Sequence, residues 1–323
     1  MKNTDQNELN NNITIGVSAC LLGAKVRFDG GHKRNRYIDE LLSEHFNFVS
    51  YCPEVAIGMS IPREPIRLVD DHGEIRVVGT RQPDNDFTEP MKSYGKRIAA
   101  SINDLCGFVF KKDSPSCGME RVKVYAENGM PEKRGTGIFA HEIIKQNPLL
   151  PVEEEGRLND PVLRENFVNR VYVYARWKAL VQSGISKHAL IDFHTRHKYL
   201  LLAHNQQTYR ELGRMISSLK QINLVEFSQH YIEKIMSVLA QPASRKKHVN
   251  VLQHLLGFLR PCLDPDDRAE VLDTIKAYGN GEYPLVVPIT MMQHHFRRNP
   301  HPFVNRQVYL NPHPRELMLR NNI

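Results

Sequence analysis

The sequence lacks both a long apolar run and a regular set of cysteines. Its 323 residues include five cysteines and one tryptophan, and no stretch approaches the roughly 20 apolar residues that a membrane helix needs. The odd, sparse cysteine count argues against a secreted disulfide framework and favours a reducing cytoplasm. The opening MKNTDQNELNNN is polar and rich in Asn, which argues against a signal peptide or anchor and predicts a disordered tail over residues 1–12. We therefore expect a cytoplasmic protein without a membrane partner.

Charge divides the chain into two unlike halves. Charged residues make up 24% and hydrophobic residues 41%, as in soluble globular proteins long enough for two domains. Residues 1–155 carry 20 Lys and Arg against 23 Asp and Glu, whereas residues 156–323 carry 23 against 13 and hold 11 of the 15 histidines. A basic half of this kind is typical of binding to a polyanion, although a solvated basic surface without a partner has the same composition.

The first half alternates short apolar runs with amphipathic stretches. This alternation predicts an α/β domain over 13–155 with a mostly parallel, Rossmann-like sheet. The expected strands are 13–17, 46–51, 107–110 and 122–125, and the expected helices are 37–46, 86–102 and 138–144. The glycine-rich start of the last helix, Gly135-Thr136-Gly137, is typical either of an anion-binding turn or of a plain turn. We expect residues 148–156 to be a linker.

The second half, residues 156–323, predicts an all-α domain. Helical spacing of apolar residues recurs from Asp160 to Phe296, and we expect the proline-rich end, from Asn299 to Leu317, to wrap the surface in extended form. His194, His197 and His204 fall near one helical face, where histidines more often hydrogen-bond within the packing than hold a metal.

Three of the five cysteines follow the ends of predicted parallel strands. Cys20, Cys52 and Cys117 would therefore meet at the sheet edge where α/β proteins bind ligands. Three converging thiolates favour a soft metal centre. A structural zinc site usually draws on Cys-x-x-Cys pairs, which are absent, whereas a cubane iron–sulfur cluster on three cysteines leaves one iron open. Ordinary buried thiols are the alternative, and Cys106 and Cys262 fit it.

Several stretches also resemble a known family. The front half resembles the TudS-type thiouracil desulfidase domain, and the back half resembles the YbgA-type C-terminal domain. Together they are similar to the bacterial tRNA 4-thiouridine desulfidases of the RudS type. The front-half stretches are VSACLLGAKVRFDGGHKRN, YCPEVAIGMSIPREPIRL, FKKDSPSCG and LPVEEEGRLND; those of the back half are DFHTRHKYLLLAHNQQTYRELGRMI, GEYPLVVPITMMQHHFRR and VYLNPHPRELMLRN.

The resemblance implies an enzyme that hydrolyses 4-thiouridine in tRNA to uridine and releases hydrosulfide. It implies a [4Fe-4S] cluster on Cys20, Cys52 and Cys117, and no nucleotide cofactor or external reductant. Glu54 matches a carboxylate that transfers protons, and Ser114 matches a serine near the substrate. By themselves, an acid after a strand and a serine in a turn are also typical of surface positions.

The loop after the first cysteine and the Ser-Pro-Ser-Cys turn supply the expected substrate contacts. Arg27, Asp29 and Lys33 would lie at the same sheet edge and suit phosphate contact or base stacking, and Ser116 shares the turn of Ser114. A solvated loop is the ordinary alternative.

Two other functions remain open at this point. One is a desulfidase of free thiouracil or thiouridine, with the back half serving assembly. The other is a non-catalytic iron–sulfur or RNA-binding protein. No obligate protein partner is indicated.

Overall fold

The chain forms two compact units that meet in the sequence at Asn159 and Asp160. The computed structural model describes residues 13–126, 128–219 and 223–323. The tail expected over residues 1–12 lies outside the described residues. Within these ranges, no helix combines the length and apolar character needed to cross a bilayer.

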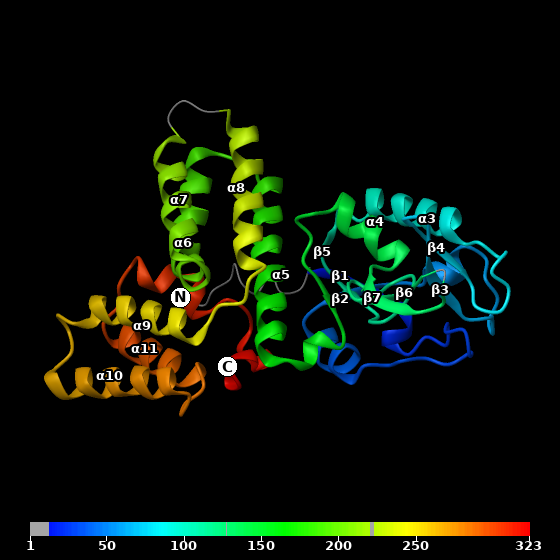
Figure 1. The fold of residues 1–323 in the computed structure, drawn as a ribbon. Coiled ribbons are helices and arrows are strands. Elements are labelled where there is room, and N and C mark those ends of the chain that lie inside the picture. Colours follow the sequence, from blue (N-terminus) through cyan, green and yellow to red (C-terminus); the bar gives the residue numbers. More distant parts are fainter. Residues whose placement is uncertain (1–12, 127, 220–222) are drawn as a thin grey trace. The chain divides into compact units, whose positions relative to one another are not determined.

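A four-stranded parallel sheet is the centre of the first unit, which confirms the expected fold class. The strand order is β2-β1-β5-β8, with β1 at Thr14–Ser18, β2 at Asn47–Tyr51, β5 at Leu105–Phe110 and β8 at Val152–Glu154. β5 is buried along its whole length, as an inner strand covered on both faces must be. Helices α3 (Thr88–Ser101) and α4 (Ile138–Gln146) pack side by side along the sheet (Figure 1).

The structure corrects two expectations about this unit. Residues 148–156 are not a linker, because β8 pairs in parallel with β5 and completes the sheet. A three-residue strand is too short for a period-2 pattern, so it could not be predicted from the sequence. The expected helix over 37–46 is a π-helical turn at Tyr37–Leu41 followed by a 3-10 turn at Leu42–Glu44.

A second sheet, of mixed direction, was not foreseen. Its order is β4-β3-β6-β7, with β3 at Ile66–Asp71, β4 at Glu74–Gly79, β6 at Val122–Tyr125 and β7 at Pro131–Gly135. β3 and β4 form a hairpin whose turn residues, His72 and Gly73, both have positive φ angles, as a type I′ turn requires. Only β3 and β6 pair in parallel in this sheet.

The second unit is all helical, as expected, and its longest helix begins at a strong cap. The Asp160 side chain accepts hydrogen bonds from Val162 N and Leu163 N at the start of α5. In Figure 1, α5 to α8 form one group of neighbouring helices and α9 to α11 form another. The helices are α5 (Pro161–Gln182), α6 (Lys187–His204), α7 (Gln206–Ser217), α8 (Leu224–Leu239), α9 (Arg245–Leu259), α10 (Pro265–Asn280) and α11 (Val286–Arg298).

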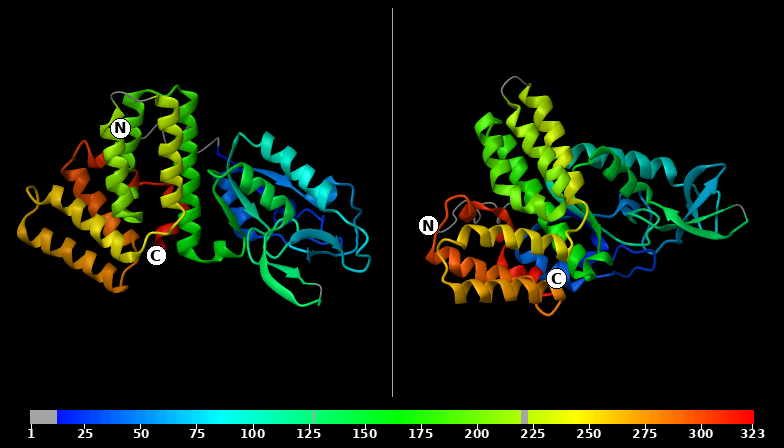
Figure 2. Two further views of the ribbon diagram at one scale, coloured as in Figure 1. Left: turned by 45° about the horizontal axis from the view of Figure 1, so that its top comes forward. Right: turned by 60° about the vertical axis from the view of Figure 1, so that its left-hand side comes forward.

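The proline-rich end of the chain does not wrap the surface in extended form. It folds into short 3-10 turns whose apolar side chains join the core of α9, α10 and α11, and both views of Figure 2 place α9 beside α10. Val304 and Tyr309 are fully buried there. The expectation of an extended path rested on the proline content and was wrong. Burial of the apolar residues between the prolines determines the path of the chain.

Buried histidines are part of the packing of the helical unit. His194 Nδ1 lies 2.9 Å from the Tyr231 hydroxyl, His197 Nδ1 2.7 Å from Phe193 O, and His204 Nδ1 2.7 Å from Gln241 O. Each of the three side chains is at most 3% exposed. They are therefore packing residues, and they cannot contact a polyanion at the surface.

We predict that these histidines make the helical unit sensitive to acid. Burial lowers the pKa of His194, His204 and His313 to about 4, and that of His248 to about 3, from an ordinary value of 6.5. Between those values the unfolded chain binds protons that the folded unit does not, so stability is complete above pH 6.5 and falls as the pH drops towards 4. Compared with neutral pH, full protonation of the unfolded chain removes roughly 3–5 kcal/mol of stability for each of these groups.

Thermal melting followed by helical circular dichroism, from about pH 7 to about pH 4.5, checks this prediction. The Tm should fall steeply below pH 6.5, and His248→Gln should flatten the slope, whereas His254→Gln, at an exposed position of the same helix, should not. A Tm that stays constant across this range would contradict the assignment.

Candidate functional site

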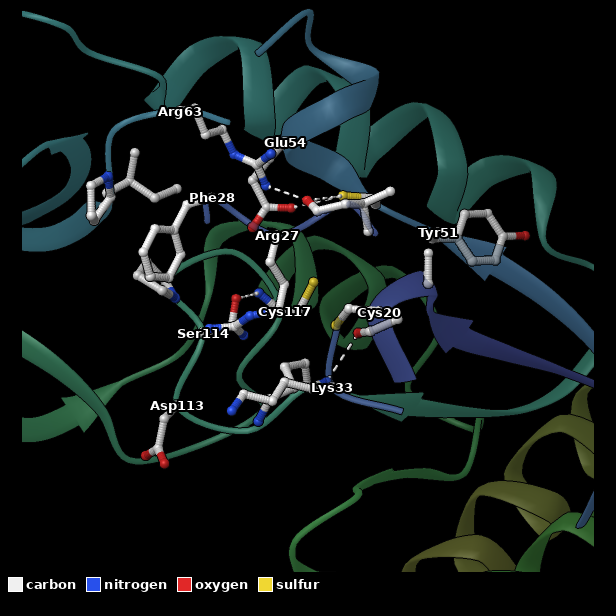
Figure 3. Close-up of a pocket in the computed structure, with 18 of the residues that line it drawn as sticks. Cys20, Arg27, Phe28, Lys33, Tyr51, Glu54, Arg63, Asp113, Ser114 and Cys117 are labelled. Carbon is white, nitrogen blue, oxygen red and sulfur yellow. Dashed lines mark hydrogen bonds between the residues drawn. The ribbon is translucent and has the colours of Figure 1, made fainter. Parts of the chain in front are cut away.

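The three cysteines expected to converge do line one pocket. Cys20 lies in the 3-10 turn Ala19–Leu22 after β1, and Cys52 precedes the short helix α2 (Pro53–Ala56) after β2. Cys117 follows β5 in the Ser-Pro-Ser-Cys turn. The pocket has a volume of about 310 Å³ and opens at the carboxyl ends of the strands (Figure 3). Parallel topology therefore brings together thiols that are far apart in the sequence.

None of the three thiols has surroundings that favour the thiolate. Burial and the neighbouring Glu54 raise the pKa of Cys52 to about 12, and they raise that of Cys117 well above its ordinary value. Burial likewise raises the pKa of Cys20. A metal or cluster bound by these thiols would have to displace their protons, because thiolates are the ligands of such sites.

The donor set consists of three thiols, the ligands that iron–sulfur clusters use. No group of three or more His, Cys, Asp or Glu side chains in the described ranges is arranged to hold a metal ion. A cubane of iron and sulfur is a larger guest, and its protein thiolates stand farther apart than the ligands of one ion. Cys20, Cys52 and Cys117, which line one pocket, supply the three thiols that a three-cysteine cluster site uses.

Hydrogen bonds from two directions hold the turn that carries Cys117. Cys117 N donates to Ser114 Oγ at 3.1 Å, and Gly118 N donates to Ser114 O at 2.8 Å. From the start of α4, Ile138 N donates to Pro115 O at 3.0 Å and Ala140 N donates to Ser116 O at 3.1 Å. The glycine-rich start of α4 thus binds carbonyls of the cysteine turn, and its N–H groups are not those of an anion site.

Gly137 is required for this close approach, and its replacement gives a prediction. A Cβ at Gly137 would lie 2.5 Å from Ser116 C and O and 2.7 Å from Cys117 N, all backbone atoms that cannot rotate away. Gly137→Ala should therefore displace the Cys117 turn and lower iron content at least about tenfold, as changes behind metal ligands do. Gly257→Ala, on an open helix surface, is the matched control and should add about 0.5–1 kcal/mol of stability. Full iron loading of Gly137→Ala would contradict the role of the glycine.

Glu54 lies beside the cysteines at one end of a hydrogen-bonded chain. Cys52 Sγ donates to Glu54 Oε2 at 3.3 Å, and the Ser116 hydroxyl donates to Glu54 Oε1. The hydroxyls of Ser116 and Ser114 are 2.9 Å apart. Ser116 is fully buried and does not line the pocket, whereas Ser114 and Glu54 do, as Figure 3 shows for the latter two. Ser114 is therefore the serine that can face a guest, and Ser116 orients the carboxylate.

Of the other residues expected to contact the substrate, two line the pocket and one does not. Arg27 and Lys33 line the pocket, together with Phe28 (Figure 3). Asp29 is not among the lining residues; it accepts a hydrogen bond from Gly31 N at 3.0 Å within its own loop.

Two consecutive acids, Glu154 and Glu155, accept hydrogen bonds from residues on either side of the cysteine turn, a role that was not predicted from the sequence. Glu155 accepts hydrogen bonds from Lys111 Nζ at 2.5 Å and from Lys112 N at 2.7 Å. Glu154 accepts one from Met119 N at 2.7 Å, two residues after Cys117. Buried acids at the end of an apolar stretch were the available signal, because such carboxylates need donors.

The chain matches two different families, one within each of its two units. Residues 15–155 match the family described as 2-thiouracil desulfurase. Residues 198–314 match a family described as a protein of unknown function, DUF1722. The chain joins a 2-thiouracil desulfurase domain to a DUF1722 domain. The expected fusion of a desulfidase-type domain with a YbgA-type domain is thereby confirmed.

Two curated relatives each match about half of this two-domain chain. The uncharacterized protein YbgA of Escherichia coli is 32% identical over 154 residues, which are 47% of this chain and 91% of YbgA. The uncharacterized protein YbbK of Bacillus subtilis is 34% identical over 152 residues, which are 45% of this chain and 98% of YbbK. A solved structure described as a [4Fe-4S]-dependent thiouracil desulfidase, TudS, is 30% identical with a TM-score of 0.36, covering 46% of this chain and 93% of that one.

Proposed function

We propose that this protein is a [4Fe-4S]-dependent desulfidase that hydrolyses 4-thiouridine in tRNA to uridine. The observation that carries the proposal is the meeting of Cys20, Cys52 and Cys117 with Glu54 in one pocket of a 2-thiouracil desulfurase domain. The three cysteines would hold the cluster. When bound, a cluster with only three protein ligands supplies an open iron that attracts sulfur and polarises a C–S bond.

The reaction balances as a hydrolysis, without an oxidant or a reductant. Water adds to the thiolated ring carbon, the C–S bond breaks, and sulfur leaves as hydrosulfide while the carbonyl of uracil forms. Glu54 accepts the proton of the attacking water and returns it as the tetrahedral carbon collapses. Ser116 holds the carboxylate through one oxygen, and Ser114 donates or accepts a hydrogen bond at the ring edge.

The rim of the pocket supports a nucleotide substrate. Arg27, Lys33 and Arg63 line it with Phe28, and Figure 3 shows these side chains around the cavity mouth. Arginine and lysine suit the phosphate of a nucleotide, and an aromatic ring suits stacking on a base that has left its helix. A free base has no phosphate and would not need these cationic side chains.

The helical unit supports a polynucleotide substrate. Residues 156–323 carry 23 Lys and Arg against 13 Asp and Glu. An open groove of about 770 Å³ beside α7 is lined by Lys198, Arg210 and Arg214, with Tyr209 among them. Cations interleaved with an aromatic ring are typical of single-stranded RNA contacts, and such binding weakens steeply with salt.

Matched turnover measurements test the substrate. We expect the protein to release sulfide faster from thiolated tRNA than from 4-thiouridine or 4-thiouracil at equal concentration. Changing Lys198, Arg210 and Arg214 together to Gln should raise KM for tRNA and lower its salt slope by about one per lost contact, with turnover of the nucleoside unchanged. Changing Arg260, Arg268 and Lys276 to Gln removes the same charge elsewhere and should leave the KM for tRNA near its original value.

Other outcomes would assign a different function. Faster turnover of the free base, with no effect of the groove substitutions, would make the protein a desulfidase of free thiouracil. If the protein contained its cluster but released no sulfide from any of the three substrates, it would be an iron–sulfur protein without desulfidase activity.

A further inference from the structure

The helical unit holds a second cavity, of about 270 Å³, that desulfurisation does not use. Its wall is built from α5, the end of α6, the start of α9, the end of α10 and the C-terminal segment; α5, α9 and α10 are labelled in Figure 1. Buried polar and charged side chains line it, which is unusual for a space inside a helical core. The lining of the cavity therefore favours a polar ligand.

Arg320 lines this cavity, and its guanidinium is fixed and has one unused donor nitrogen. Its side chain is 6% exposed, its Nε donates to Glu165 Oε1 at 2.8 Å, and its Nη1 donates to Tyr309 O at 2.7 Å. The third nitrogen, Nη2, is buried and has no hydrogen-bond partner in the described part of the chain. A buried charged donor without an acceptor costs at least about 1–3 kcal/mol, so a guest that brings an oxygen is stabilised.

Asn169 adds an unused acceptor to the same wall. Its side chain is 4% exposed, and its Oδ1 is buried without a partner among the described residues. A guest that satisfies both Arg320 and Asn169 carries an anionic oxygen and a hydroxyl or amine.

The start of α9 makes the cavity attractive to anions. Ser244 is the N-cap residue of α9 and its side chain makes no capping hydrogen bond, which leaves the positive end of the helix dipole open to the cavity. Arg245 follows, and its guanidinium lies 4.7 Å from the Tyr278 ring while Nη1 donates to Tyr278 O at 2.8 Å.

The charged side chains of the wall are two arginines, Arg245 and Arg320, and one acid, Glu165. Glu165 is already paired with Arg320. Burial lowers the pKa of His204 to about 4 and that of His248 to about 3, so both imidazoles are neutral at pH 7. Glu165 is therefore the one acidic side chain among the lining residues, and it is paired with Arg320 rather than with Arg245 or the N-terminus of α9.

We propose that this cavity binds a small phosphate monoester. Its phosphate oxygens would be held by Arg245, by Arg320 and by the start of α9, and a hydroxyl group of the ligand would donate to Asn169. Two arginines at a helix N-terminus match the charge and the fork geometry of phosphate. The volume is slightly below that of pockets for drug-sized ligands, which suits a sugar phosphate and is too small for folded RNA. The proposal does not depend on the desulfidase activity.

Calorimetry on the full chain tests this site, with ribose 5-phosphate and inorganic phosphate as probes and ribose as the neutral comparison. We expect ribose 5-phosphate to bind at least tenfold more tightly than ribose. Ser244→Asp should weaken phosphate binding at least tenfold by placing a negative charge at the mouth, although aspartate is as good an N-cap as serine and should preserve folding. Arg245→Gln should produce a loss of similar size.

The control for Ser244→Asp is the same substitution at another N-cap. Ser186 caps α6 through Ala189 N and does not line the cavity, so Ser186→Asp should leave ribose 5-phosphate binding unchanged. Failure of both phosphate probes to bind the unmodified protein would overturn the proposal. So would wild-type affinity in a folded Ser244→Asp variant, or binding confined to 5′-phosphorylated RNA, which is included as a separate probe beside its 5′-hydroxyl form.

Discussion

Serine at Cys20, Cys52 or Cys117, one at a time, is expected to remove both the cluster and the activity. Each thiol comes from a different strand end, so its loss leaves that side of the pocket without a thiol ligand. Changes behind metal ligands already lower affinity about 10- to 100-fold, and loss of a ligand should exceed this. Iron and acid-labile sulfide counts, the visible absorbance of the anaerobically purified protein, and sulfide release from thiolated tRNA should all fall to background.

The two remaining cysteines are the controls for that result. Cys262 is exposed and is not among the residues that line the pocket, so Cys262→Ser should keep full iron content and activity. Cys106 is buried in β5, and Cys106→Ser should lower stability while the cluster stays bound. An iron-free variant of Cys117 that retained wild-type turnover would exclude the cluster from the reaction.

Glu54→Gln is expected to separate cluster binding from catalysis. Glutamine keeps the shape of the side chain and can still bond to the Ser116 hydroxyl, but it cannot accept a proton from water. Loss of a general base typically lowers turnover about 10²- to 10⁴-fold. Iron content should not fall, because removal of a negative charge beside three thiolates lessens their repulsion. Single-turnover sulfide release, normalised to iron, measures the effect.

A neighbouring acid supplies the matched control for Glu54. Asp113 lines the same pocket and has a φ of 57°, which asparagine tolerates well. Asp113→Asn should therefore retain turnover within about twofold. Equal losses in Glu54→Gln and Asp113→Asn would indicate a general effect of charge in the pocket rather than proton transfer by Glu54.

The two hydroxyls of the cysteine turn extend this test. Ser116→Ala should lower kcat with little change in KM, because Ser116 acts through the Glu54 carboxylate. Ser114→Ala should also change KM, since Ser114 faces the cavity. The sequence alone placed both serines near the substrate and could not assign these separate roles, which depend on how α4 packs over the turn.

Long-range convergence was the most predictable part of the site. Cys20, Cys52 and Cys117 each follow an apolar run, and parallel pairing sends all carboxyl ends to one edge whatever the loops between them do. The third acid of the Glu153 to Glu155 run was not predictable in this way. Its role depends on a three-residue strand that brings Glu155 to Lys111, and a segment that short has no pattern of its own.

The sequence by itself determined the division into an α/β unit and a basic helical unit, and the strand ends at which the cysteines stand. These features follow from the periodicity of apolar residues and from charge composition, which are local properties of the chain. Only the tertiary structure decided which serine faces the pocket, that the proline-rich end enters the core, and that Arg320, Asn169 and the start of α9 line a second cavity. Those outcomes depend on which residues, distant in the sequence, are buried together. Buried polar atoms need hydrogen-bond partners, and local sequence patterns do not show which distant groups provide them.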